Sequence, residues 1–316
     1  MNTAAKLSAY GAALALVAGG AWAAGTAVGP FAGEPTAAAG TPGGEDAGHG
    51  DAHSGTVAEA AAPEQPGGLA SSRGGYTLTP TATTLTPGPD QPFSFTISGP
   101  DGAPVTAYDV EHEKRMHLIV VRRDTSSFQH VHPELGADGV WRTGLDLSDP
   151  GSYRVFADFK PTGGEALTLG VDTAVPGDFQ PRAFEPAREA VVDGYRVRLD
   201  GDLVPGQSSK LTLTVDKDGT PVTDLQPYLG AYGHLVALRG GDLAYLHVHP
   251  DGEPGDGKTP AGPGVTFHAE VPSAGTYRLF LDFQHGGTVR TAEFTVSTAG
   301  TPETAPEPHA TDGHGH

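Results

Sequence analysis

Two short His-Val-His-Pro segments are the feature of this sequence best suited to chemistry. The histidines lie two positions apart both in residues 130–133 and in residues 247–250. On a β-strand such residues face the same side, with Cα atoms roughly 6.5–7 Å apart, a separation that two imidazoles can close on one ion. A third histidine lies 13 residues before each pair, at His117 and at His234. The pattern predicts one three-imidazole metal site in each copy, formed by His117, His130 and His132 and by His234, His247 and His249.

Two kinds of residue are candidates for supporting these sites. Asp158 and Asp282 each stand between aromatic residues in an otherwise apolar stretch. A buried carboxylate needs a donor, and a hydrogen bond from a ligating imidazole would provide one. Met116 offers copper a soft thioether ligand, although filling a core is the commoner role of methionine. The histidines without a counterpart in the other copy receive less weight: His112, His268 and His285.

Other functions fit the same residues. Histidines and aspartates also form structural hydrogen-bonded networks that hold no metal. Retention of the same three positions in both copies favours metal binding, and the absence of cysteine leaves imidazole-rich sites for copper or zinc. A zinc hydrolase is a third hypothesis. No HExxH, GxSxG or phosphate-binding glycine motif supports catalysis, so we expect a binding protein rather than an enzyme.

An internal repeat must position these residues. Residues 101–106 match residues 218–223 at an offset of 117, and the three histidine positions keep that offset. After an insertion in the second copy, residues 150–159 match residues 274–283 at an offset of 124. The chain therefore contains two diverged copies of one module.

The strand pattern within each copy predicts the fold. Residues 92–97 and 210–215 alternate between apolar and polar side chains, which is typical of half-buried strands. Residues 117–121 and 234–238 are continuously apolar and are predicted to be central strands. No convincing amphipathic helix occurs in the repeats. The sequence predicts an all-β protein with two tandem Ig-like or cupredoxin-like β-sandwich modules.

The N-terminus is predicted to export the protein. Residues 7–29 form 23 uncharged positions, long enough to cross a hydrocarbon layer of about 30 Å. Lys6 precedes this stretch and the first acidic residues follow it, which places the body outside the cell. An uncleaved transmembrane anchor is favoured, because the stretch exceeds the usual ~7–15-residue core of a signal peptide. The alternative is a signal peptide cleaved after Ala21-Trp22-Ala23.

Composition sets the remaining bounds. A net charge of −19 argues against nucleic acid as a partner and favours cations. The predicted organisation is an anchor at 1–29, a disordered linker at 30–74, module 1 at 75–175, a linker at 176–194, module 2 at 195–298 and a disordered tail at 299–316. The two outer segments carry histidines that are either solvated or metal-collecting: His49, His53, His309, His314 and His316.

Residues 76–297, and above all the two His-Val-His-Pro segments, resemble a group of bacterial secreted or membrane-anchored proteins, many of them actinobacterial. That group carries YtkA-like or FixH-like Ig-type domains. The resemblance implies an Ig-type fold and a loose link to heavy-metal or copper handling, with no established activity. The second copy in that group often has methionine before the Gly-His pair, where this chain has Tyr232.

Overall fold

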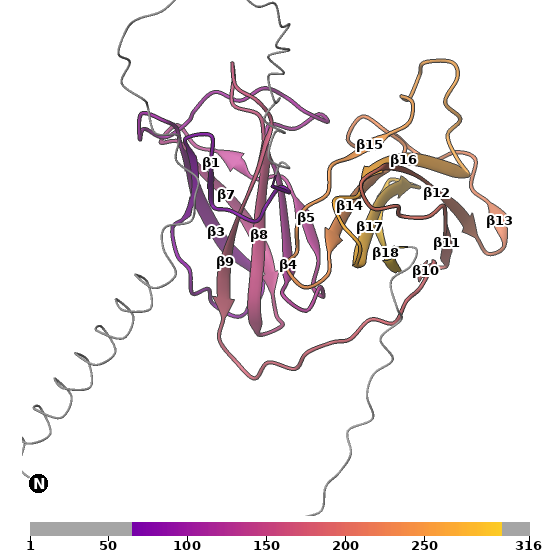
Figure 1. Cartoon of the computed structure of the whole chain (residues 1–316), viewed down its shortest axis with the longest axis horizontal. Helices are drawn as coiled ribbons and strands as arrows, with labels where there is room; N and C mark the ends of the chain where they lie inside the picture. Colours follow the sequence, from indigo (N-terminus) through magenta and orange to yellow (C-terminus); the bar gives the residue numbers. More distant parts are fainter. Residues whose placement is uncertain (1–64, 299–316) are drawn as a thin grey trace, which may run out of the picture. The chain divides into compact units, whose positions relative to one another are not determined.

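A computed structural model describes residues 65–298, and every regular element within that range is a β-strand (Figure 1). The predicted all-β fold is confirmed. The predicted anchor at 1–29, residues 30–64 of the first linker and the tail at 299–316 lie outside the described residues. Between residues 65 and 298, no helix is long and apolar enough to span a membrane.

Module 1 consists of two antiparallel sheets packed face to face. The first has the order β1-β2-β3-β7-β6, and the second has the order β5-β4-β8-β9. The strands are β1 (Ser72–Arg73), β2 (Tyr76–Pro80), β3 (Gly88–Ser98), β4 (His117–Arg122), β5 (Gln129–Val131), β6 (Glu134–Leu135), β7 (Val140–Leu147), β8 (Gly151–Phe159) and β9 (Leu167–Val175).

Module 2 repeats this plan with one difference in strand pairing. Its outer sheet has the order β10-β11-β12-β16-β15, with β13 on β12, and its second sheet has the order β14-β17-β18. The strands are β10 (Glu189–Val192), β11 (Tyr195–Asp200), β12 (Ser208–Lys217), β13 (Thr220–Pro221), β14 (His234–Arg239), β15 (Val248–Pro250), β16 (Gly264–Glu270), β17 (Thr276–His285) and β18 (Thr288–Ser297).

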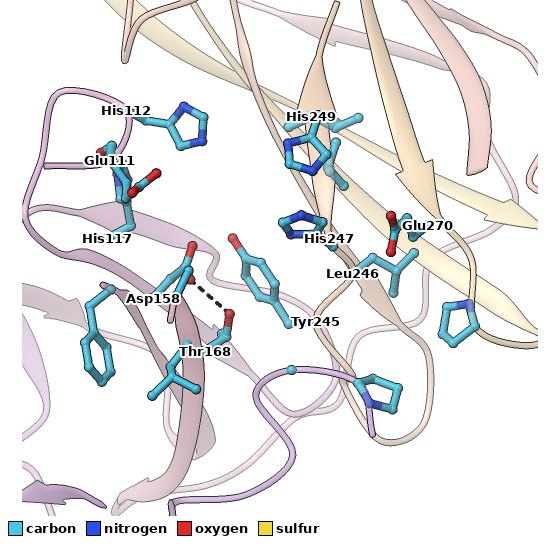
Figure 2. Close-up of a pocket in the computed structure, with 18 of the residues that line it drawn as sticks. Glu111, His112, His117, Asp158, Thr168, Tyr245, Leu246, His247, His249 and Glu270 are labelled. Carbon is cyan, nitrogen blue, oxygen red and sulfur yellow. Dashed lines mark hydrogen bonds between the residues drawn. The ribbon is translucent and has the colours of Figure 1, made fainter. Parts of the chain in front are cut away.

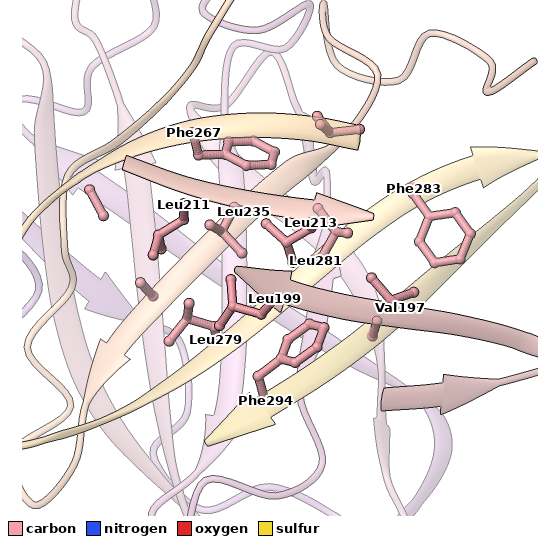
Figure 3. Close-up of a cluster of buried hydrophobic side chains, with 14 of the residues drawn as sticks. Val197, Leu199, Leu211, Leu213, Leu235, Phe267, Leu279, Leu281, Phe283 and Phe294 are labelled. Atoms are coloured by element: carbon pink, nitrogen blue, oxygen red, sulfur yellow. The ribbon is translucent and has the colours of Figure 1, made fainter. Parts of the chain in front are cut away.

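Each module has its own core, formed as the period-two alternation predicts. In β3, Phe93, Phe95 and Ile97 point inward and are at most 2% exposed, while the residues between them are partly exposed. In β12, Leu211 and Leu213 occupy the equivalent inward positions and pack among the aromatic residues of module 2 (Figure 3). Burial of alternate apolar side chains between two sheets is the main stabilising contribution within each module.

A third apolar cluster joins the two modules. It contains Ile119, Val121, Phe156, Val236, Leu238, Leu243 and Phe280. Six of these residues are three equivalent pairs, because the offsets of 117 and 124 relate Ile119 to Val236, Val121 to Leu238 and Phe156 to Phe280. The interface therefore has the self-complementary character of a two-fold dimer contact.

The flanking aromatic residues follow the same approximate symmetry. Phe128 of module 1 stacks on Phe280 of module 2, with ring centroids 4.0 Å apart. Tyr245 is the residue equivalent to Phe128, and it packs against Phe156 of module 1 at 5.6 Å. Each module thus contributes one aromatic side chain to the partner's interface sheet.

This interface explains the continuously apolar strands and corrects one prediction about them. Leu118 and Val120 face the core of module 1, whereas Ile119 and Val121 face module 2. Strand β4 is central as predicted, but β14 lies at the edge of its sheet order. On its open side β14 pairs only with residues 244–246, which belong to no named strand. Its apolar character comes from burial on both faces, against the core of module 2 and against module 1.

Two segments predicted to be linker contain ordered structure. Residues 65–74, expected in the disordered linker, include β1, and Tyr245 of module 2 donates its backbone N–H to the Gly67 carbonyl. Gly68 adopts a φ of +73°, and a Cβ there would meet the Phe156 ring at 2.4 Å. This close approach requires glycine. Glu189–Val192, within the predicted inter-module linker, forms β10 on β11.

Replacing Phe280 with alanine tests the contribution of the interface. Its side chain is fully buried, and its removal leaves a cavity beside Phe128. We expect Phe280→Ala to lower the free energy of unfolding by about 3–5 kcal/mol, measured by urea denaturation. Val289→Ala, at a position that is 39% exposed, is the control and should change it by about 0.5 kcal/mol or less. A loss below about 1 kcal/mol for Phe280→Ala would contradict a tightly packed interface.

Candidate metal centre

The first residue of each interface strand is a histidine, and the alternation of the strands places both on the inter-module face. His117 lies on the side of β4 that carries Ile119 and Val121, and His234 lies on the side of β14 that carries Val236 and Leu238. The two imidazoles consequently meet where the apolar cluster ends. Their rings are stacked, with centroids 5.4 Å apart and an interplanar angle of 3°.

Strand β5 brings a third imidazole to this point. His130 is paired with Ile119 of β4, and its Nε2 lies 3.0 Å from Nδ1 of His117. Its Nδ1 lies 2.7 Å from Oδ2 of Asp282 in module 2. Asp282 also accepts a hydrogen bond from the Thr291 hydroxyl at 2.6 Å. A polar chain therefore crosses the interface between the modules.

The ring nitrogens converge closely enough to bind one ion. Single nitrogens of His117, His130 and His234 all lie within 4.8 Å of one another. His132 adds a fourth ring, with its centroid 5.0 Å from that of His117 and 4.8 Å from that of His130. Four imidazoles bound tetrahedrally at about 2 Å would have ring centres about 5 Å apart. The separations among His117, His130 and His234, and those from His132 to His117 and His130, are close to that value, and the nitrogens within 4.8 Å of one another belong to His117, His130 and His234.

His132 supplies an independent observation. Its Nε2 is buried and has no hydrogen-bond partner among residues 65–298. A buried polar atom without a partner costs stability, so such atoms are rare in folded proteins. Coordination of a cation by this nitrogen would remove the cost.

Burial keeps most of these imidazoles neutral. Desolvation lowers the pKa of His117 to about 4 and the pKa of His132 to about 3, and the pKa of His234 falls well below its usual 6.5. Repulsion from the neighbouring histidines, once charged, acts in the same direction. Neutral imidazole is the form that binds metal, so these nitrogens are available at neutral pH.

The hydrogen bonds determine where the protons lie. A carbonyl oxygen only accepts, so His117 donates from Nε2 to the Glu111 carbonyl and its Nδ1 carries no proton. His130 must then donate from Nε2 to that Nδ1. The 2.7 Å contact with Asp282 requires a second proton.

The structure does not group the histidines into one trio per module, as the sequence predicted. His234 joins His117 and His130 of module 1, while His247, just before β15, and His249 of β15 are exposed. The cause is strand pairing, because residues 129–131 of β5 pair with β4, whereas in module 2 the chain leaves β14 after Leu246 and residues 248–250 pair with β16. Leu246 still bonds to Ala237 of β14, and the chain then turns away at His247.

The predicted supporting residues also differ between the copies. Asp282 bonds to a clustered histidine as expected, although that histidine belongs to the other module. Asp158 accepts from the Thr168 hydroxyl at 2.9 Å, and burial raises its pKa. Met116 is 1% exposed and packs in the core of module 1, on the face of its segment opposite to His117. Met116 therefore fills the core of module 1 rather than offering its thioether to a metal beside His117.

A cleft of about 730 Å³ leads to the cluster (Figure 2). His117 and His234 line it together with His247, His249 and Asp158. Figure 2 shows His247 and His249 on the side of the cleft opposite to His117, with Tyr245 beside Asp158. The two groups of predicted ligands therefore share one opening, although they do not share one site.

His112 is a nearby residue that was not predicted to be a ligand, because it has no counterpart in the other copy. Its ring centroid is 6.1 Å from that of His117 and 5.7 Å from that of His234. It occupies a two-residue turn in which both His112 and Glu113 have positive φ, a conformation that favours glycine or asparagine. The equivalent turn in module 2 is Leu229-Gly230. No strand periodicity links His112 to His117, so the sequence contains no signal for this contact.

The remaining unpaired histidines have different surroundings. His285 lies between the Tyr195 hydroxyl and Asp224, at 2.7 and 3.0 Å, as part of a hydrogen-bonded network within module 2. His268 of β16 is paired with His249 of β15. The structural role is clear for His285, whereas His268 extends a group of histidines on the exposed face of module 2.

The fold and site define a tandem Ig-like β-sandwich protein with a histidine cluster shared by its two modules. The chain belongs to the family described as Domain of unknown function (DUF8832), which matches it twice, over residues 70–177 and 190–300. No curated protein matches the chain.

Solved structures show partial likeness. One is the Escherichia coli adhesin FdeC, with 14% identity and a TM-score of 0.22, covering 72% of this chain and 65% of that one. Another is a putative membrane anchored protein from Corynebacterium diphtheriae, with 11% identity and a TM-score of 0.21, covering 74% of this chain and 60% of that one. A third is the Ig1-2 module of the Drosophila receptor protein tyrosine phosphatase DLAR, with 9% identity and a TM-score of 0.19, covering 71% of this chain and 97% of that one. This chain thus spans less than two thirds of the FdeC structure and of the Corynebacterium structure. Overlaps of this size carry no information about function.

The lowered pKa values predict acid sensitivity of the metal-free protein. A histidine with a depressed folded-state pKa contributes stability that is complete above its unfolded pKa of about 6.5 and is lost as pH falls. We expect the free energy of unfolding of chelator-treated protein to fall between pH 6.5 and about 4, by on the order of 1 kcal/mol per pH unit for each of His117, His132 and His234. The raised pKa of Asp158 offsets part of this loss.

Urea denaturation across this pH range measures the effect. His117→Gln is the matched variant, because glutamine keeps a polar side chain that does not titrate. Its stability should depend less steeply on pH than that of the unchanged protein. Equal slopes for the two proteins would show that His117 does not have the buried, neutral state described above.

Proposed function

We propose that this protein binds one divalent transition-metal ion between its two modules, with His117, His130, His234 and His132 as ligands. The observation that carries this proposal is the convergence of imidazole nitrogens from both modules within 4.8 Å. The unpartnered Nε2 of His132 supports it independently. Copper(II) and zinc are the ions that an all-imidazole site without thiolate suits best.

The surrounding hydrogen bonds suit metal binding. Ligating histidines typically donate their second ring N–H to a carboxylate or a backbone carbonyl, which fixes the orientation of the ring. The Glu111 carbonyl does this for His117, and Asp282 does it for His130. In the metal-free protein a proton lies between Nδ1 of His117 and Nε2 of His130. A bound ion would take the place of that proton, and binding would release it.

The wider proposal is an exported, membrane-anchored protein that handles copper or zinc as a buffer, chaperone or sensor. Residues 7–29 support export, and the net charge of −19 favours cationic partners. The resemblance to YtkA-like or FixH-like domains agrees with a metal-related role in the cell envelope. Binding rather than catalysis is proposed, because the motifs of hydrolytic enzymes are absent from the sequence.

A second candidate function is a structural or protein-interaction module of the envelope. The hydrogen bonds of the cluster favour this function, because both ring nitrogens of His117 and of His130 have hydrogen-bond partners without any metal. The apolar cluster also joins the modules without any ion. In this case the histidines only organise the interface, and no metal dependence is expected.

His234→Ala separates the two functions. We expect it to weaken binding of copper(II) or zinc to the interface by about 100-fold or more, because it removes a ligand contributed by module 2. Isothermal titration calorimetry measures the affinity, in matched experiments with each metal. His285→Ala is the control, because this histidine belongs to a separate network in the same module. It should leave the affinity unchanged.

Two outcomes would contradict the metal site. One is the absence of any tight binding by the unchanged protein, with His234→Ala merely less stable. The other is equal affinity in His234→Ala and the unchanged protein, which would exclude His234 as a ligand. The first outcome would favour the structural function.

A further inference from the structure

Module 2 carries a second set of imidazoles outside the interface cluster. His247 and His249 lie two positions apart, with ring centroids 4.0 Å apart. Strand pairing places His268 directly opposite His249. Residues opposite each other on adjacent strands share a face of the sheet. His247 directly precedes β15, and its carbonyl accepts a hydrogen bond from the Glu270 N–H of β16, which keeps it beside the same sheet. We name His247, His249 and His268 the outer histidine group.

The outer histidine group differs from the interface cluster in exposure. His247 and His249 are exposed, and the side chain of His268 is 42% exposed. The side chain of His130 in the interface cluster is only 2% exposed. Solvent can therefore complete the coordination of an ion at the outer group, and the ion can leave without local unfolding.

Acidic groups accompany these histidines. Asp251 Oδ2 lies 3.7 Å from Nε2 of His268, and Glu270 lies beside His247 and His249 in the lining of the cleft. Lys210, 3.9 Å from Asp251, is the one neighbouring cation seen in an ion pair with these acids among residues 65–298. Asp251 and Glu270 thus offer carboxylate oxygens to a divalent cation, although Arg73, Lys114 and Arg115 also line the cleft.

The cleft connects the two sets of histidines. His247 and His249 line it on the side opposite to His117, and His234 also lines it (Figure 2). His112, held in its strained turn, lines the same cleft and contacts both His117 and His234. Imidazole nitrogens are consequently spaced along the cleft from the exposed face of module 2 to the interface.

We propose that the outer histidine group is a second, solvent-open site for copper(II) or zinc, and that it captures ions and passes them through the cleft to the interface cluster. The transfer part rests on the proposed function of that cluster. The outer site binds more weakly, because its side chains are exposed and are not held by buried hydrogen bonds. Its exposure makes capture fast.

The sequence identified His247 and His249 as candidate ligands but could not reveal their grouping with His268. His268 has no counterpart in module 1, where Gly144 occupies the equivalent position. The loss of pairing between β15 and β14 also moves His247 and His249 out of the interface. Both changes are specific to module 2, so comparison of the two copies does not predict them.

The test uses the full chain with the histidines of the two outer segments replaced by alanine, so that they do not contribute: His49, His53, His309, His314 and His316. Calorimetry gives the number of zinc and copper(II) ions bound and their affinities. Stopped-flow transfer of zinc from a fluorescent chelator gives the rate of uptake. The variants are His249→Ala/His268→Ala, which removes the outer site, and His117→Ala, which disrupts the interface cluster. Thr266→Ala, on the exposed face of β16, is the matched control.

We expect the unchanged chain to bind one tight and one weaker ion. His249→Ala/His268→Ala should lose only the weaker ion and should take up zinc about tenfold more slowly, because capture limits association. His117→Ala should lose only the tight ion. The Thr266→Ala control should keep both ions and the original rate.

Two results would overturn parts of this account, and they are distinguishable. If His249→Ala/His268→Ala keeps both ions and the original rate, the outer site is wrong and the interface site stands. If the unchanged chain binds a single weak ion that only His249→Ala/His268→Ala removes, the interface site and the transfer are wrong.

Discussion

The packing of strands β4 and β14 face to face is the constraint on which the rest of the structure depends. Four side chains of these strands, together with Phe156, Leu243 and Phe280, form a fully buried cluster of seven, and their burial contributes on the order of 10 kcal/mol before entropy is subtracted. Because the two strands belong to equivalent parts of the repeat, the contact is approximately two-fold symmetric. It extends along both strands as far as their first residues, His117 and His234, and so brings two histidines from different modules into contact.

The histidine cluster uses this symmetric frame asymmetrically. His130 reaches across the interface to Asp282, whereas its equivalent, His247, makes no such bond to Asp158 within residues 65–298. A difference in strand pairing is the physical cause, since β5 stays on β4 while β15 joins β16. One copy of the motif consequently places its histidines in the buried interface, and the other presents exposed histidines. Duplication followed by a local change of pairing can therefore produce two different histidine arrangements from one motif.

Much of the fold could be predicted because it depends on local pattern. Alternation in β3 and β12 fixed which residues face the cores, and the offsets of the repeat fixed which strands are equivalent. The continuous apolar character of residues 234–238 was misleading about position in the sheet. A strand buried by another module and a strand buried between two neighbours have the same composition, so sequence alone does not separate them.

The candidate site was predicted in part, for a similar reason. The histidines of interest were identified from their spacing, and Asp282 was identified from its apolar surroundings. Their grouping depends on long-range contacts, such as that between His130 and Asp282, which are 152 positions apart. His112 reaches the cluster from a turn with an unfavourable backbone conformation. No periodicity in the sequence encodes contacts of either kind.

The most direct measurement is a crystal structure of the zinc-loaded or copper-loaded protein, with the ion located by anomalous scattering. The account predicts an anomalous peak at the inter-module cluster, about 2 Å from ring nitrogens of His117, His130 and His234. A peak bound only by histidines of a single module, or an interface without an ion at saturating metal, would contradict the claim that one ion joins the two modules.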